Sequence, residues 1–264
     1  MSFWLYVLAS GVGGLLVGVL GTGSSLVLLP SLALIFGATL SSGTSLRLAA
    51  GTTMATMAVG AIAGAIAQHR AGHIDVQLFR LTVLPYALGA LAGPWVSRLL
   101  PTTVLGIYVS AVICAVALRM LFSRPEQSES DRTYQAHRLE ISLTLVLIGI
   151  GSSIAGIASG IFAIPFLTRF SIPMRTVIGT STASAAVYSA FGAIGYVSAG
   201  WSESGLPEGH LGFVYVPAFA VMAVTALIAA PIGVSLARSI DERSLKRLFA
   251  VFLLIAAGAI ALAK

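Results

Sequence analysis

Apolar runs of membrane-spanning length alternate with short polar connections along the whole chain. A bilayer-spanning helix needs about 20 mostly apolar residues, and most of the runs come close to that length. The pattern therefore predicts an all-α polytopic membrane protein that forms one transmembrane domain over residues 1–264. The expected segments lie at residues 3–20, 26–40, 45–67, 78–99, 103–122, 139–157, 161–170, 175–200, 211–237 and 245–263.

Two of these segments, 26–40 and 161–170, are unusually short. Each follows a Gly/Ser-rich break, which is Gly21–Ser25 in the first case and Gly156–Gly160 in the second. Short, interrupted hydrophobic segments in corresponding positions are typical of secondary transporters. We expect two short broken or re-entrant helices beside about eight full transmembrane helices. The sequence leaves open whether the short segments span the bilayer.

The composition excludes an ordinary soluble protein. Hydrophobic residues make up 57% of the chain and charged residues only 9%, whereas soluble domains carry about a quarter charged residues. The net charge of +6 comes from Lys and Arg in the connections, so it predicts orientation in a bilayer and no nucleic-acid partner. The single cysteine, Cys114, allows no disulfide framework. The apolar N-terminal stretch lacks Lys and Arg before Arg47, and we expect a retained segment rather than an export signal.

The distribution of Lys and Arg predicts how the chain crosses the membrane. If each short segment, together with the segment before it, brings the chain back to the side from which it started, twelve Lys and Arg residues lie on one side of the membrane and three on the other. Otherwise the numbers are seven and eight. The positive-inside bias favours the first arrangement. We therefore expect a multi-pass protein of the cell (inner) membrane, with both termini outside and a cytoplasmic linker at residues 123–138. The twelve cytoplasmic residues would be Arg70, Arg80, Arg119, Arg124, Arg132, Arg138, Arg169, Arg175, Arg238, Arg243, Lys246 and Arg247.

The two halves of the chain resemble each other. A shift of 128 residues places Arg47 on Arg175 and residues 51–72 on residues 179–200, with ten of 22 positions identical. Chance would give about a tenth in a chain so rich in Ala and Gly, and a shift of 135 aligns the two breaks. Because five segments is an odd number, the second copy would enter the membrane with opposite polarity. The expected units are two inverted five-segment repeats, residues 1–122 and 139–264, joined by the linker 123–138.

Several motifs recur in the same order in both halves. Each break is followed five residues later by Pro, in SSLVLLPSL from Ser24 and in SGIFAIPFL from Ser159, and later segments begin with GTT at Gly51 and GTS at Gly179. With the stretch HRAGHID from His69, these motifs resemble the sulfite exporter TauE/SafE family over essentially the whole chain. The resemblance implies a permease for sulfite, sulfoacetate, related organosulfonates or other small anions. The family usually has Gly-Gly-Gly at the first break, where this chain has Gly-Ser-Ser, and this departure bears on substrate choice.

Independently of that resemblance, the two breaks are candidate anion sites. The first backbone N–H groups of a helix have no intrahelical partner and carry the positive end of the helix dipole. Ser and Gly permit close backbone approach, and Ser adds a hydroxyl donor. The alternative is that the serines only cap their helices. The candidate substrate-binding residues at the breaks are Gly23, Ser24, Ser25, Ser159 and Gly160.

Two further features are related by the repeat. Thr52 and Thr53 in one half, with Thr180 and Ser181 in the other, supply a second set of hydroxyl groups for substrate contact. The alternative is helix packing, because small and hydroxyl residues let membrane helices approach closely.

The third paired feature consists of Arg47 and Arg175, four residues before the repeated glycines. An arginine at bilayer depth is costly and usually functional, so the pair could attract anions to the two entrances and gate them. At a helix end the same side chain can simply anchor the helix at the interface.

Acidic residues do not occur deep within any expected segment. The sequence therefore offers no carboxylate pair for a proton relay or a sodium site, and we expect neither a metal nor a cofactor. Proton coupling would have to come from a substrate such as bisulfite, or from His69 and His73 near one membrane surface.

We predict a secondary transporter of a small sulfur-containing oxyanion, with a midplane site where the two breaks meet. Export is expected, because the membrane potential drives an anion out of the cytoplasm. The alternatives are an anion channel or a non-transport structural subunit of a membrane complex. An intramembrane enzyme is not expected, because no catalytic pairing or cofactor motif is visible. The Gly/Ala-rich helix faces leave a homodimer possible.

Overall fold

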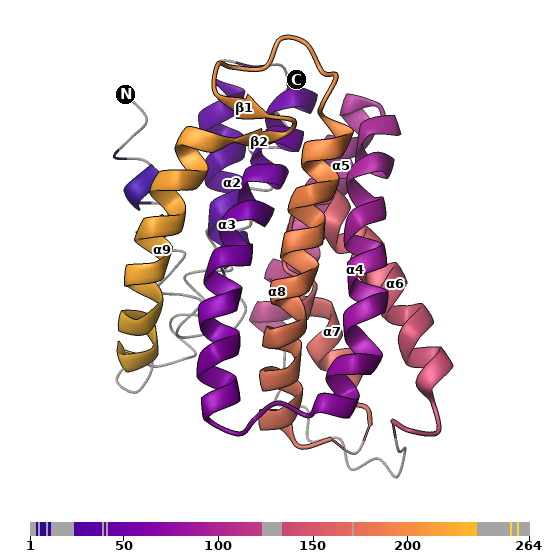
Figure 1. The fold of residues 1–264 in the computed structure, drawn as a ribbon. Coiled ribbons are helices and arrows are strands. Elements are labelled where there is room, and N and C mark those ends of the chain that lie inside the picture. Colours follow the sequence, from indigo (N-terminus) through magenta and orange to yellow (C-terminus); the bar gives the residue numbers. More distant parts are fainter. Residues whose placement is uncertain are drawn as a thin grey trace.

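The computed structural model is a bundle of long helices packed side by side, as Figure 1 shows. It describes residues 4, 6–8, 10–11, 24–38, 40, 42–122, 134–170, 172–236, 254 and 258. Most of the expected segments 3–20 and 245–263, Gly23 and most of the linker lie outside the described residues. The described elements are α2 (Ser24–Gly37), α3 (Ser42–Arg70), α4 (Val76–Leu99), α5 (Thr102–Phe122), α6 (Arg138–Ile154), α7 (Gly160–Leu167), α8 (Met174–Ala199), β1 (His210–Leu211), β2 (Val214–Tyr215) and α9 (Val216–Leu236).

Helices of membrane-spanning length agree with the hydropathy pattern. Among the described residues, three helices are long and apolar enough to cross a bilayer: Gly43–Arg70, Val76–Leu99 and Arg175–Ala199. They match the expected segments 45–67, 78–99 and 175–200 to within a few residues. The chain is therefore a helical membrane protein, while the total of eight full spans stays a prediction.

Helices α3 and α8 lie against each other at the centre of the bundle and run in opposite directions. Small residues make this contact close: the Met54 side chain of α3 packs on Gly192 of α8, where an added Cβ would lie 3.1 Å from the Met54 sulfur. Helix α2 packs on α3, and α9 lies on another part of α3. The helices at the centre of the bundle therefore come from both halves of the sequence.

Helix α4 packs on both α6 and α8. Gly89 and Gly93 of α4 form a Gly-x-x-x-Gly pair that faces Gly149 and Ser153 of α6, and a Cβ on Gly89 would lie 2.9 Å from the Gly149 Cα. The Ser153 hydroxyl donates to the Gly89 carbonyl at 3.3 Å. Without side chains between them the two backbones come into contact, which is how small residues stabilise helix pairs in lipid.

The break between α6 and α7 is fully enclosed by the bundle. Helix α6 ends at Ile154, and α7, which contains Pro165, is only eight residues long. Gly156 lies between them with φ of 68°, a conformation that favours glycine. An added Cβ there would also overlap Ala50 of α3. The short, interrupted segment expected at 161–170 is thus present as α7, and the second break is held against a helix of the first half.

A small β-hairpin is the one described departure from an all-α chain. Strands β1 and β2 pair antiparallel, with His210 opposite Tyr215, and Gly212 in the turn has φ of 55°. The segment expected at 211–237 therefore begins too early, since α9 starts at Val216. Hydropathy alone could not separate these apolar hairpin residues from the helix that follows them.

Two exposed tryptophans lie at the hairpin end of the bundle, and two arginines lie at helix termini of the opposite end. Arg70 ends α3 and Arg175 begins α8, at the end opposite the hairpin. At the hairpin end, Trp95 near the end of α4 and Trp201 just after α8 are both exposed, as expected for aromatic residues at a membrane interface. The sorting of charges agrees with the expected orientation, although which end faces the cytoplasm stays a prediction.

Candidate functional site

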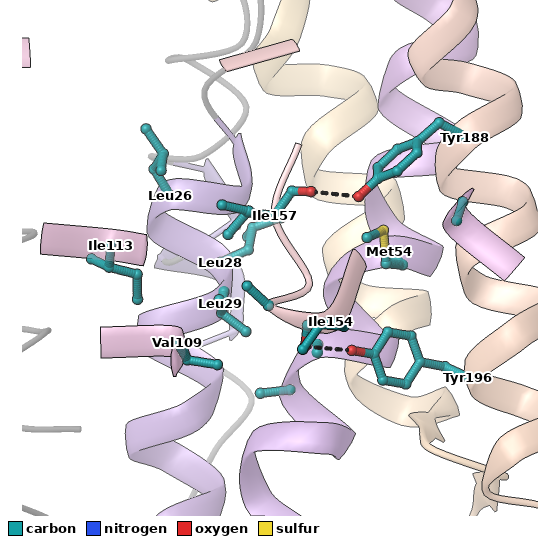
Figure 2. Packing of buried hydrophobic residues seen from close by; sticks show 14 of the residues in the cluster. Leu26, Leu28, Leu29, Met54, Val109, Ile113, Ile154, Ile157, Tyr188 and Tyr196 are labelled. Atoms are coloured by element: carbon teal, nitrogen blue, oxygen red, sulfur yellow. Dashed lines mark hydrogen bonds between the residues drawn. The ribbon is translucent and has the colours of Figure 1, made fainter. Parts of the chain in front are cut away.

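The carbonyl groups at the end of α6 are bound by tyrosine hydroxyls from α8. The Tyr196 hydroxyl donates to the carbonyls of Ser153 at 2.7 Å and Ile154 at 3.1 Å. About two turns earlier in α8, the Tyr188 hydroxyl donates to the Ile157 carbonyl at 2.9 Å. Figure 2 shows both rings pointing from α8 towards the break. The Ile154 and Ile157 carbonyls have no other donor among the described residues, and unpaired polar groups are costly in a buried region.

The remaining carbonyls of this helix end are also largely occupied. The Tyr108 hydroxyl of α5 donates to the Gly151 carbonyl at 2.8 Å. The backbone amide of Ile157 donates to the Ser152 carbonyl at 3.0 Å. The negative end of the α6 dipole is thus neutralised by hydroxyl and amide donors from three elements.

The amide groups at the start of α7 are in the opposite condition. The backbone N–H groups of Ser159 and Gly160 donate to no acceptor among the described residues. The Ser159 side chain makes no capping hydrogen bond, so the alternative in which this serine merely caps its helix is not the arrangement seen. The break therefore offers two amide donors at a helix start that have no described acceptor, and donors of this kind can bind an anion.

The first break reaches the second through Ser25. This serine, near the start of α2, is fully buried, and its hydroxyl oxygen accepts the Ala158 amide at 2.9 Å. No described residue accepts the proton of this hydroxyl. The structure thus brings Ser25, Ser159 and Gly160 together in one place. Gly23 lies outside the described residues, and for Ser24 only the backbone is described.

Thr53 lies on the same part of α3. Ala50 contacts the break at Gly156, and Thr53 follows one helical turn later on that face. Its hydroxyl is buried without a hydrogen-bond partner, as is that of Ser181 on α8. Both groups keep their donor capacity, although only Thr53 can be placed near the described break.

The other two hydroxyl candidates, Thr52 and Thr180, hold loops in place. The Thr52 hydroxyl donates to the Leu48 carbonyl at 2.7 Å and accepts the Tyr215 amide at 3.0 Å. The Thr180 hydroxyl accepts the Asp75 amide at 3.0 Å. Each threonine thus binds the residue directly before the next helix of the opposite half, a role closer to the packing alternative than to substrate contact.

The two arginines occupy different environments. The Arg47 guanidinium donates to the carbonyls of Ser97 at 3.2 Å and Leu100 at 2.8 Å, at the C-terminal end of α4. A cation at this position also interacts favourably with the helix dipole. Arg175 is exposed in the first turn of α8. The structure therefore gives Arg47 a helix-capping contact, and attraction of anions by either arginine stays a prediction.

Tyr86 of α4 is a site residue that the sequence did not point out. It is 1% exposed, and its ring packs edge-on against Tyr188 with centroids 6.0 Å apart. Its hydroxyl lies beside the Ser159 side chain but has no hydrogen bond of standard geometry. The only signal in the sequence is a tyrosine at the centre of an apolar helix.

Potential metal ligands are scattered. Within the described part of the chain, no three His, Cys, Asp or Glu side chains come together to hold a metal ion. Asp75 caps α4 by accepting the amides of Gln77 and Leu78. The His73 ring contacts the Gln68 side chain at 2.9 Å. These groups belong to the turn between α3 and α4 and lie outside the break.

Comparison with known proteins identifies the family of the chain. The family model for "Sulfite exporter TauE/SafE" matches residues 6–260. A "Probable membrane transporter protein" of Haemophilus influenzae is 28% identical over 255 residues, which is 96% of each chain. One of Xylella fastidiosa is 28% identical over 69% of this chain and 70% of its own. The "Probable membrane transporter protein YdhB" of Bacillus subtilis is 24% identical over 75% and 80%. No solved structure matches the chain.

Proposed function

The chain belongs to the sulfite exporter TauE/SafE family, and from this premise we propose that it exports a small sulfur-containing oxyanion, such as sulfite or an organosulfonate, by secondary transport. The family and the relatives make it a membrane transporter rather than an enzyme. The substrate, the direction and the mechanism are our proposal.

The observation that carries the proposal is the imbalance of hydrogen-bonding groups at the break between α6 and α7. Tyrosine hydroxyls donate to the carbonyls of Ser153, Ile154 and Ile157, while the amides of Ser159 and Gly160 have no acceptor among the described residues. A sodium ion would require free carbonyl or carboxylate oxygens. An oxyanion requires donors, and these are what the break presents.

The contacts of the repeated Gly-Thr pairs support alternating access by two inverted repeats. Gly51 and Gly179 each press against a loop residue, Phe213 and His73 respectively. The following residues, Thr52 and Thr180, accept an amide two positions further along the same loops. The two contacts lie at opposite ends of the antiparallel pair α3 and α8, as an inverted relation between the halves requires.

The enclosure of the break favours a transporter over a channel. All residues from 152 to 160 are buried, so this conformation offers no continuous open path at the break. Movement of one half against the other would expose the site to each side in turn. Under the predicted orientation, the membrane potential favours export by about 2.3 kcal/mol per charge per 100 mV.

A ligand-binding experiment tests the proposal. Purified protein in detergent is heated with sulfite, sulfate, thiosulfate, taurine, sulfoacetate or acetate. A ligand that binds only the folded state, present at 100 times its dissociation constant, stabilises by about 2.7 kcal/mol. We expect this stabilisation with sulfite or a sulfonate and not with acetate. No response to any sulfur oxyanion would overturn the proposed substrate class.

Matched serine variants locate the site. Ser159→Ala should reduce the ligand-induced shift while leaving the stability of the free protein unchanged, because this hydroxyl makes no capping bond. Ser198→Ala is the control, since that exposed hydroxyl bonds only the Gly195 carbonyl within its own helix. In proteoliposomes, saturable flux with counterflow is expected. Flux that does not saturate would indicate a channel instead.

A further inference from the structure

We propose that the break binds its anion in a singly charged form, held entirely by uncharged donors, with the Tyr86 hydroxyl as a direct substrate contact. This inference rests on the proposed function and names the charge class of its substrate.

The donors around the break carry no formal charge. They are the amides of Ser159 and Gly160, the Ser25 hydroxyl and the Tyr86 hydroxyl. The sequence has no Lys or Arg before Arg47, and none between Arg138 and Arg169. Both breaks therefore lie in stretches without a cation.

Arg47, the cation expected to attract anions, donates its hydrogen bonds to a helix end. The Arg47 guanidinium is directed to carbonyls at the end of α4, with its closest contact to Leu100 at 2.8 Å. That end of α4 lies beside the hairpin end of the bundle. In this structure no described cation neutralises an anion bound at the break.

Tyr86 supplies an observation independent of the helix terminus. Its hydroxyl is buried beside the Ser159 side chain and makes no hydrogen bond of standard geometry with any described residue. A buried hydroxyl usually finds a partner, because an unpaired one carries a desolvation penalty. The Tyr188 ring, packed edge-on at 6.0 Å, restricts the position of the Tyr86 ring. A ligand oxygen at the start of α7 would give this hydroxyl its missing acceptor.

Charge selection follows from the cost of desolvation. The cost of moving an ion out of water rises with the square of its charge, so a dianion pays about four times the cost of a monoanion. The interaction energy between neutral hydrogen-bond donors and the bound ion rises only about in proportion to the charge of the ion. A site with these donors therefore accepts bisulfite or a monosulfonate and discriminates against sulfate and doubly charged sulfite.

The same reasoning accounts for the absence of a carboxylate deep within any of the expected membrane segments. Sulfite and bisulfite interconvert near neutral pH, so bisulfite carries its proton across with it. No side chain needs to release or accept that proton within the membrane. A monosulfonate without another ionisable group, such as methanesulfonate, carries one charge at all physiological pH values and needs no proton at all.

Two probes of nearly the same shape separate charge from size. Methanesulfonate has one charge at every pH used, whereas methylphosphonate loses a second proton near neutral pH. Their dissociation constants are measured on the purified protein by calorimetry at about pH 6 and about pH 9. We expect methanesulfonate to bind equally at both pH values. Methylphosphonate should bind at least about tenfold more weakly at the higher pH, where it is doubly charged.

The Tyr86→Phe variant tests the contact itself. It should weaken methanesulfonate binding about tenfold, whereas Tyr134→Phe, which removes a hydroxyl that donates to Asp75 at 3.2 Å, should leave it unchanged. Unchanged binding by a folded Tyr86→Phe variant would overturn the contact. If that variant does not fold, the wild-type comparison of the two probes still decides the charge inference. Equal or tighter binding of doubly charged methylphosphonate would overturn it, whereas failure of both probes and of sulfite would overturn the proposed function.

Discussion

The contact between Gly51 and the hairpin gives a sharp test of the packing. A Cβ at Gly51 would overlap the Phe213 carbonyl oxygen and lie 2.9 Å from the Tyr196 Cβ. Ordinary carbon contacts are 3.4–4 Å, so Gly51→Ala must push the hairpin away from α3. The displaced loop also carries the amide of Tyr215, which donates to the Thr52 hydroxyl at 3.0 Å.

The expected cost follows from these contacts. Overpacking of this kind costs about 1–3 kcal/mol, and loss of the Thr52 hydrogen bond adds about 1 kcal/mol. The higher helix propensity of alanine than of glycine offsets about 1 kcal/mol of this loss in the free energy of unfolding. We therefore expect Gly51→Ala to lower the free energy of unfolding by roughly 1–3 kcal/mol. Gly179→Ala should behave alike, since its Cβ would lie 2.7 Å from the His73 Cβ.

The measurement is equilibrium unfolding in mixed micelles, followed by circular dichroism. Gly106→Ala in α5 is the matched control, because its Cβ would meet only the Leu46 side chain at 4.0 Å. That variant should be unchanged or stabilised by up to about 1 kcal/mol. If Gly51→Ala unfolds at the same denaturant concentration as Gly106→Ala, the close approach of α3 to the hairpin is refuted.

Two further predictions concern polar contacts. Tyr196→Phe removes the only donor to the Ile154 carbonyl among the described residues; stability should fall by about 1–3 kcal/mol and anion affinity should fall as well, because a bare carbonyl then faces the site. Equal melting temperatures for the variant and wild type would contradict this. Arg47→Gln should destabilise the protein by about 1–3 kcal/mol through its α4 contacts; retained flux per folded molecule would limit the role of Arg47 to these contacts. Arg175 is exposed and provides the comparison, since Arg175→Gln should leave stability unchanged. Lower flux per folded molecule of the Arg47→Gln variant would indicate that Arg47 attracts anions.

The class of protein and the positions of its long helices could be predicted from sequence. Hydropathy placed the helices later found as α3, α4 and α8, because each is a nearly uninterrupted apolar run. It could not separate the hairpin from α9, since Leu211, Phe213 and Val214 lead without a charged residue into the apolar run of the helix. There, the turn at Gly212 and the pairing of two short strands decide the structure.

The candidate site was predictable in part. Gly/Ser-rich breaks pointed to Ser25, Ser159 and Gly160, because only such sequences let a helix stop inside a membrane. Thr52 fitted the same chemistry in sequence, yet its hydroxyl proved to be occupied by a loop amide. Tyr86 could not be identified, because its proximity to Ser159 arises from the packing of α4 beside α6 and α8.

The sequence by itself therefore determined that this chain lies in a membrane, belongs to a transporter family and interrupts a helix at defined positions. These properties depend on local composition, length and spacing. Only the tertiary structure decided which backbone groups at the break have a hydrogen-bond partner among the described residues. Tyrosines from α5 and α8 donate to carbonyls at the end of α6, while the amides of Ser159 and Gly160 have no acceptor among the described residues. Hydrogen bonds between residues far apart in sequence thus create the arrangement on which the proposed anion site rests.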